Sequence, residues 1–271
     1  MSIRKGLLMI FVSLLVLVAG CGSKATETEK EKEVSGSPAE KPKLQMVTAA
    51  TFPPFEFTDT TSETSEIKGL DIDIAEYIAT ELGFEFEITS LTFSSIVAAI
   101  KEGRADFSLT GMLPTPERKE NVDFSDIYFI PREAIIWKED DKTEYTSINQ
   151  LEGKKVGVSL SSVQEKKIQS VQDTVVTSMN GNAEVIKEIS AGRVDAGFMI
   201  STQAESFLET NKGLKMHIVE KDPQDKLGFA IALPKDSEWT EKFNTVLEEM
   251  KENGELDKII LKWLGSEYIE G

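Results

Sequence analysis

The stretch Lys155-Val156-Gly157-Val158-Ser159-Leu160-Ser161-Ser162-Val163-Gln164-Glu165 joins a strand pattern directly to a helix start. Its apolar residues alternate over 156–160, as they do in a strand with one buried face. Ser162 and Glu165 have the spacing of a capping box, which satisfies free N–H groups at the start of a helix. The stretch therefore predicts a strand followed at once by a helix, the repeating unit of α/β proteins.

The same alternation of strand and helix patterns extends from Leu44 to the end of the chain. A helix at 71–82 begins at Asp71, whose side chain is placed to cap it, and a helix at 94–102 ends before Gly103. Two series of such units, separated by a short segment near Pro131, predict an α/β fold with two lobes and a cleft. The expected strands are 44–50, 84–88, 105–109, 156–160, 194–199, 214–219 and 228–233, and the further expected helices are 182–191, 237–252 and 255–264; a short apolar stretch at 134–137 precedes the second series.

Composition narrows the classes of function. The chain has 271 residues, of which 40% are hydrophobic, enough for one large domain or two modest lobes. Its net charge of −17 disfavours nucleic acid and anionic lipid as partners, and solubility is the simplest reading of that charge. One cysteine and one histidine, His217 in the strand at 214–219, allow neither a disulfide nor a thiolate metal cluster nor a Ser/His dyad. We expect no metal and no cofactor.

The N-terminus has the pattern of an export signal. Arg4 and Lys5 precede an apolar run at 7–19 that is short for a membrane span. Val18-Ala19-Gly20-Cys21 resembles the bacterial lipobox, although a chance cysteine is the alternative. This predicts a signal peptide at 1–20, a lipidated Cys21 and a disordered tether at 21–43 that holds the protein at the extracytoplasmic face of a bacterial cell membrane.

Several motifs in a fixed order identify a family. The first half contains Thr51-Phe52-Pro53-Pro54-Phe55-Glu56-Phe57, Gly69-Leu70-Asp71-Ile72-Asp73, Gly103-Arg104-Ala105-Asp106, Thr115-Pro116-Glu117-Arg118 and Val122-Asp123-Phe124-Ser125-Asp126. The second half adds Leu151-Glu152-Gly153-Lys154-Lys155-Val156-Gly157-Val158, Gln164-Glu165 and Gly192-Arg193-Val194-Asp195-Ala196. Together they resemble the family 3 extracellular solute-binding proteins, the polar amino-acid receptors of ABC importers, over about residues 44–265.

This resemblance implies a type II periplasmic-binding-protein fold. The first lobe would hold 44–132 and 233–271, the second about 136–229, and two crossing segments would form the hinge. A ligand between the lobes would favour closure by touching both. The function implied is the substrate-binding component of an ABC importer for an amino acid or related small carboxylate, acting as a monomer beside a permease.

Arg118 is the first candidate for the binding site. A guanidinium can grip a carboxylate through two parallel N–H bonds, which fixes direction as well as adding energy. Thr115 can cap the short turn that Pro116 opens and so hold the arginine in place. The alternative is a surface arginine paired with Glu117 or Glu120.

The resemblance implies further ligand contacts. Thr110 lies where relatives have a donor to the ligand carboxylate, and Gly111 would let the backbone come close. Phe52 and Phe93 match an aromatic pair that flanks the ligand, although either could belong to the core. Ser161, Ser162 and Val163 form a strand-to-helix turn whose N–H groups could meet the carboxylate or serve as plain caps.

Three positions depart from the family pattern. Ile200 stands where relatives carry an acid for the ligand ammonium, Leu113 where a Thr or Ser is usual, and Ala49 where receptors for basic amino acids often have an acid. Either a residue at 201–203 (Ser201, Thr202 or Gln203) supplies the missing acceptor, or the solute lacks an ordinary ammonium. A one-residue slip in the alignment is the third reading. Basic amino acids are the least expected ligands.

Two other functions compete with import. A few relatives of this fold are dehydratases, but the cleft positions assigned above include no carboxylate or histidine for acid or base work, so we expect no enzyme. A sensor or co-receptor would suit the tether equally well, although the sequence shows no output domain.

Overall fold

The computed structural model describes residues 41–60, 65–220 and 226–269. The predicted signal peptide, Cys21 and nearly all of the predicted tether lie outside the described residues. No helix in these ranges is long and apolar enough to cross a membrane.

The first lobe is built on strands that are far apart in the sequence. β1 (Lys43–Thr48) pairs in parallel with β5 (Glu85–Ser90), and β6 (Asp123–Phe129) pairs antiparallel with β12 (Phe229–Leu233). Isolated bridges from Phe107 to Met46 and from Ser108 to Ala232 connect the two pairs. A small antiparallel sheet of β2 (Thr51–Phe52), β3 (Glu56–Asp59) and β4 (Glu66–Lys68) stands beside them.

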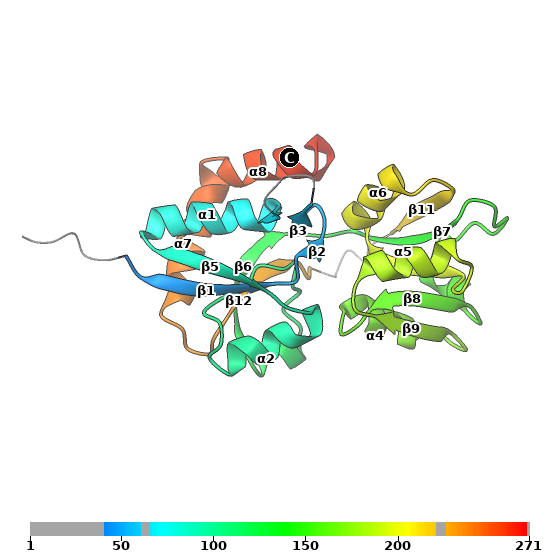
Figure 1. Cartoon of the computed structure of the whole chain (residues 1–271), viewed down its shortest axis with the longest axis horizontal. Helices are drawn as coiled ribbons and strands as arrows, with labels where there is room; N and C mark the ends of the chain where they lie inside the picture. Colours follow the sequence, from blue (N-terminus) through cyan, green and yellow to red (C-terminus); the bar gives the residue numbers. More distant parts are fainter. Residues whose placement is uncertain (1–40, 61–64, 221–225, 270–271) are drawn as a thin grey trace, which may run out of the picture. The chain divides into compact units, whose positions relative to one another are not determined.

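Helices cover these strands on both sides. Figure 1 shows α1 (Leu70–Leu82) and α8 (Glu255–Trp263) above β1 and β5, and α2 (Ile96–Lys101) below them. The remaining helices are α7 (Trp239–Glu252), the short α3 (Pro116–Lys119), and 3-10 turns at Phe93–Ser95 and Ser266–Tyr268. Phe84, Phe107 and Phe243 are fully or almost fully buried and contact one another in the core between the helices and the strands.

The second lobe is one five-stranded sheet in the order β11-β7-β10-β8-β9. Its central strands are almost wholly apolar, because helices cover both faces. The strands are β7 (Glu133–Lys138), β8 (Lys155–Ser159), β9 (Val175–Met179), β10 (Ala196–Ile200) and β11 (Leu214–Val219), and the helices are α4 (Val163–Gln169), α5 (Asn182–Ser190), α6 (Ser201–Thr210) and a 3-10 turn at Ile148–Leu151.

The two-lobed α/β fold is confirmed, and most expected elements lie within a few residues of their predicted bounds. The segment at 105–109 was expected to be a strand, but it does not form a regular one. It makes only two isolated bridges, a parallel one from Phe107 to Met46 and an antiparallel one from Ser108 to Ala232. The cap expected from Asp71 is also wrong, since its buried side chain accepts hydrogen bonds from elsewhere. The structure also contains strands that were not expected, β2, β3, β4, β6, β7 and β9, and one such helix, α6. The exact bounds of the lobes stay a prediction.

Candidate functional site

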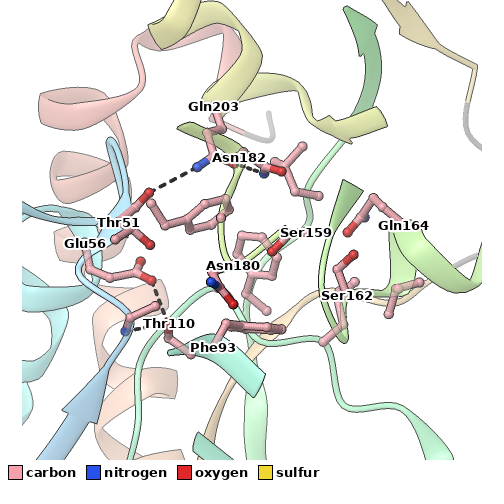
Figure 2. Close-up of a pocket in the computed structure, with 18 of the residues that line it drawn as sticks. Thr51, Glu56, Phe93, Thr110, Ser159, Ser162, Gln164, Asn180, Asn182 and Gln203 are labelled. Carbon is pink, nitrogen blue, oxygen red and sulfur yellow. Dashed lines mark hydrogen bonds between the residues drawn. The ribbon is translucent and has the colours of Figure 1, made fainter. Parts of the chain in front are cut away.

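A pocket lies between the two lobes. Figure 2 shows side chains from both lobes converging on it. The first lobe contributes Ala49, Thr51, Phe52, Glu56, Phe93, Thr110, Gly111, Leu113, Arg118 and Phe229, and the second contributes Ser159, Ser162, Val163, Gln164, Asn180, Gly181, Asn182, Ile200 and Gln203. All but one of the predicted ligand-binding residues line this pocket. The exception is Ser161, which touches the site through its backbone carbonyl.

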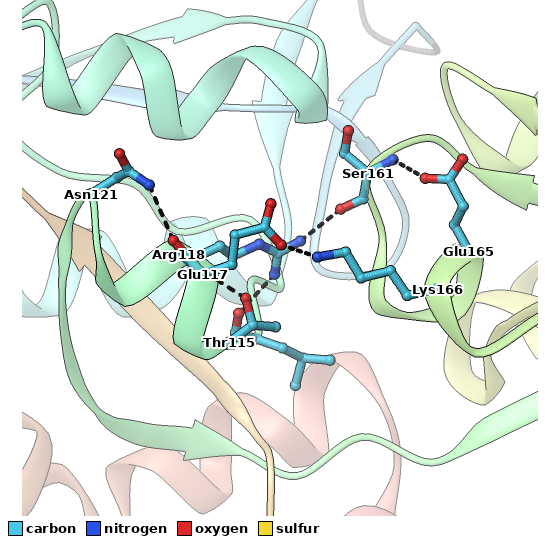
Figure 3. A network of polar contacts seen from close by, with 8 residues as sticks. Thr115, Glu117, Arg118, Asn121, Ser161, Glu165 and Lys166 are labelled. Carbon is cyan, nitrogen blue, oxygen red and sulfur yellow. Dashed lines mark hydrogen bonds and ion pairs between the residues drawn. The ribbon is translucent and has the colours of Figure 1, made fainter. Parts of the chain in front are cut away.

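Arg118 projects from the short helix α3 into the pocket. The Thr115 hydroxyl accepts a hydrogen bond from the Arg118 N–H at 3.3 Å, so the predicted cap is confirmed. The guanidinium donates to the Leu113 carbonyl at 2.7 Å and, across the cleft, to the Ser161 carbonyl at 2.9 Å (Figure 3). It also lies over the Phe93 ring, 5.2 Å from the centroid.

Arg118 has no carboxylate within salt-bridge distance in the described part of the chain. The alternative pairing with Glu117 is not formed, because Glu117 pairs across the cleft with Lys166 instead (Figure 3). Burial lowers the pKa of Arg118 to about 10, which still leaves the group charged at neutral pH. A half-buried cation without a countercharge favours an anionic ligand.

Glu56 also lines the pocket, and it was not among the predicted site residues. It lies on β3 and is completely buried. Its Oε1 accepts a hydrogen bond from the Thr110 hydroxyl at 2.6 Å (Figure 2), and that hydroxyl accepts one from the Ala49 N–H at 3.2 Å. The single hydroxyl hydrogen of Thr110 is thus used inside the protein, and the expected donation to a solute is not available while this bond holds.

Behind Glu56 lies a second buried acid, Asp71. Its Oδ2 accepts from the Gly111 N–H and its Oδ1 from the Tyr128 hydroxyl, both at 2.9 Å. Burial, and then the charge of Asp71, hold the pKa of Glu56 well above its ordinary value; burial raises the pKa of Asp71 to about 6. The expectation of a cleft without a carboxylate is therefore wrong. The clue in the sequence was Glu56 between Phe55 and Phe57, an acid within an apolar run.

Aromatic rings close one end of the pocket. Phe52 stacks on Phe55 with centroids 5.0 Å apart and meets the edge of Phe229 at 6.0 Å, so it belongs both to the pocket and to the adjoining core. Gly111 has a φ of 53°, and a Cβ there would lie 2.4 Å from the Phe52 ring. Glycine is needed here because any side chain would displace that ring.

The second lobe lines the pocket mostly with neutral polar groups. Ser162 caps α4 by accepting from the Glu165 N–H at 3.0 Å, whereas the Glu165 carboxylate accepts from Ser161 N–H at 2.6 Å. The expected capping box is thus half right, since the carboxylate reaches one residue further back. Asn182 donates to the Gln203 side chain, whose amide in turn approaches the Thr51 carbonyl of the first lobe at 3.5 Å (Figure 2).

The three departures from the family pattern all face the pocket. Ala49, Leu113 and Ile200 are among its lining residues and each is less than a tenth exposed. Of the three candidates for a replacement acceptor, Gln203 lines the pocket and Ser201 and Thr202 do not. Within the described ranges, no cluster of histidine, cysteine, aspartate or glutamate could hold a metal ion.

Comparison with known proteins matches residues 44–266 to the bacterial extracellular solute-binding proteins, family 3. The arginine-binding extracellular protein ArtP of Bacillus subtilis (strain 168) is 38% identical over 94% of this chain and 98% of its own length. A solved structure of an ancestral arginine-binding protein bound to arginine superposes with a TM-score of 0.77 at 37% identity, covering 83% of this chain and 99% of that one. The ancestral amino-acid-binding protein AncCDT-1, a precursor of cyclohexadienyl dehydratase, gives 0.74 at 30% identity over 82% and 95%.

Proposed function

The chain belongs to the family 3 bacterial extracellular solute-binding proteins, and from this premise we propose that it captures an amino acid or a related small carboxylate for an ABC importer. The observation that carries this proposal is Arg118, half-buried and without a carboxylate partner, in a pocket between two lobes. Relatives named for amino acids, among them arginine, support the same class of solute.

Arg118 would hold the carboxylate. Two of its five N–H groups donate to backbone carbonyls, which fixes the guanidinium and leaves three for a ligand. On the facing side, the Ser162 hydroxyl and the N–H of Val163 could add donors, whereas the N–H groups of Ser161 and Ser162 already donate to Glu165 and to the Ser159 carbonyl. This arrangement would grip the carboxylate from both lobes.

The rest of the solute would lie between the rings of Phe52 and Phe93 and over Gly111. Both rings keep partly exposed surface at the pocket. A solute in this place would touch both lobes and so favour the closed state. Arg118 to Ser161 and Gln203 to Thr51 are contacts between the lobes that would form on closure.

Binding without catalysis agrees with the position of Glu56. A general acid or base must reach the atom that it protonates or deprotonates. Glu56 is completely buried and one of its oxygens is occupied by Thr110. It lines the pocket with one oxygen bound to Thr110 and no water-exposed surface, unlike a general acid or base that exchanges protons with solvent.

We place the protein at the extracytoplasmic face of the cell membrane through a lipid on Cys21, with the permease as its partner and a monomer as its working form. Labelling with radioactive palmitate tests the anchor. Wild type should take up label and Cys21→Ala should not; equal labelling would rule the anchor out.

A thermal-shift screen against amino acids, keto acids and simple carboxylates tests the proposed function. A ligand at 100 times its dissociation constant adds about 2.7 kcal/mol to the free energy of unfolding, which raises the melting temperature measurably. A screen in which only compounds without a carboxylate stabilise the protein would contradict the proposal.

A further inference from the structure

One side of the pocket contains a dipeptide with its own chemistry, Asn180-Gly181. It joins β9 to α5, and both of its residues line the pocket. Asn180 is exposed, and Figure 2 shows it among the side chains that face the pocket. Asparagine followed by glycine is the sequence in which an asparagine side chain most readily reacts with the backbone, because glycine has no Cβ to obstruct the approach.

The groups that would react are not held by other contacts. β9 ends its pairing with β8 at Met179, so Asn180 lies beyond the last paired residue. The Asn180 N–H donates to the Glu184 carboxylate at 3.3 Å, but within the described residues neither the Asn180 side chain nor the Gly181 N–H makes a hydrogen bond. The side-chain amide can therefore turn toward the Gly181 nitrogen without losing a partner.

The chain contains a second Asn-Gly dipeptide, which serves as an internal comparison. Asn253 and Gly254 lie between α7 and α8, and Asn253 is also exposed. Its Oδ1 accepts from the Glu255 N–H at 2.9 Å, and its Nδ2 donates to the Tyr77 hydroxyl at 3.3 Å. Both ends of this side-chain amide are held, so it must break two hydrogen bonds before it can react.

The reaction needs only the protein and water. The Gly181 nitrogen loses its proton and attacks Cγ of Asn180; a C–N bond forms, the bond from Cγ to Nδ2 breaks, and ammonia leaves. The product is a five-membered succinimide. Water then opens this ring at Cγ to give aspartate, or at the main-chain carbonyl carbon to give isoaspartate. Each product replaces a neutral amide by a carboxylate.

We propose that Asn180 is a site of spontaneous deamidation, and that the new carboxylate gives the second lobe a negative charge at the pocket and weakens capture of a carboxylate solute. The effect on capture rests on the proposed function, whereas the modification does not. Arg118 is the cation that would hold the solute, and a second anion in the same pocket repels the solute carboxylate and offsets that attraction.

Peptide mapping by mass spectrometry tests the modification without any solute. Wild type is incubated at mildly alkaline pH, and the peptides with Asn180 and Asn253 are followed for the mass gain of an amide that becomes a carboxyl group. We expect deamidation at least about tenfold faster at Asn180, because two hydrogen bonds restrain Asn253. An equal or slower rate at Asn180 would overturn the proposal.

Gly181→Ala tests the route through the succinimide. Gly181 has an extended backbone with a φ of −172°, and a Cβ there would meet only the Thr51 hydroxyl oxygen, at 3.6 Å, so the variant should fold. Its new methyl group obstructs the attack on Asn180 and should slow deamidation there, with the rate at Asn253 unchanged. Deamidation of Asn180 at the wild-type rate in this variant would rule the route out.

Asn180→Asp carries the charge of the modified protein and tests its effect on capture. Calorimetric titration uses the carboxylate that stabilises wild type most in the thermal-shift screen, and we expect binding at least about tenfold weaker than in wild type. Asn149→Asp adds the same charge on an exposed residue away from the pocket and is the control. Equal affinities for wild type and Asn180→Asp would refute the effect on capture. A screen without any carboxylate ligand would contradict the proposed function, and peptide mapping would still decide the modification.

Discussion

The two lobes meet the pocket with different chemistry. The first lobe brings Arg118, the aromatic rings and the buried side chains of Thr110, Glu56 and Asp71, whereas the second brings serines and side-chain amides. Charged groups are costly to bury and need partners of fixed geometry, which the first lobe supplies from within itself. Neutral amides can exchange partners at small cost when a cleft opens. The first lobe therefore recognises the charge of the solute. The second lobe supplies neutral hydrogen-bonding groups that can change partners when the cleft closes.

The largest expected effect comes from removing the charge of the first lobe. Arg118→Ala should weaken binding of the best carboxylate ligand by about a hundredfold or more, because a buried charge-assisted pair is lost. Calorimetric titration measures this loss. Arg104→Ala is the matched control, since Arg104 is an exposed arginine of the same lobe paired with Glu102. Equal affinities for wild type and Arg118→Ala would show that the charge is not used.

Gly111→Ala should disturb the first lobe itself. The new Cβ would collide with the Phe52 ring at a positive φ, which we expect to cost about 1–3 kcal/mol of unfolding free energy and to weaken binding. Gly103→Ala is the control, because Gly103 has a φ of 71° and nothing within 4 Å of its Cβ position. Chemical denaturation compares the two variants. If both variants lost a similar amount of unfolding free energy, the positive φ alone would explain the loss. The contact between the new Cβ and the Phe52 ring would then contribute nothing.

Loss of an amide in the second lobe should have a smaller effect. Asn182→Ala removes a neutral hydrogen-bonding group and leaves Gln203 without its donor, so we expect about a tenfold loss of affinity. Asn149→Ala, in the 3-10 turn away from the pocket, serves as control. If Asn182→Ala weakened binding as much as Arg118→Ala, the two lobes would not differ in the way described.

The pH dependence of stability should distinguish wild type from Glu56→Gln. Burial raises the pKa of Glu56 above its ordinary value of 4.5, so the stability that this group contributes is fully present below pH 4.5 and is lost as the pH rises toward the raised pKa. The variant has no such loss. Its melting temperature relative to wild type should therefore increase between pH 5 and pH 7, and a constant difference over that interval would contradict the raised pKa.

The smallest effect is expected at the rim. Glu117 and Lys166 pair across the cleft on exposed side chains, 68% and 57% accessible. Exposed pairs are screened by water and salt, so Lys166→Gln should change ligand affinity less than about twofold, and less still at high salt. Calorimetric titration of wild type and Lys166→Gln with the ligand at two ionic strengths measures this change in affinity. A large effect that persists in high salt would make this pair part of the closure mechanism.

Local patterns predicted much of the fold. Elements with a regular apolar pattern were predictable, as in the alternation of Phe86 and Ile88 in β5 and the apolar stripe of α7, because packing on one side fixes the period of the apolar residues. β9 was missed because it is an edge strand of Thr, Ser and Val with little buried surface. A strand was predicted at 105–109 from its apolar residues. The neighbouring strands decide whether a continuous row of backbone hydrogen bonds forms, and here they allow only isolated bridges.

Sequence by itself determined the α/β class, the motif order that marks the family and the importance of Arg118, because these depend on residue types and short-range spacing. Only the tertiary structure showed that two acids are buried at or near the pocket. Glu56 and Asp71 are fifteen positions apart in the sequence, and folding buries both of them completely, which raises the pKa of each. Protonation of an acid is set by its neighbours and its distance from water, and the chain supplies both only when it is folded.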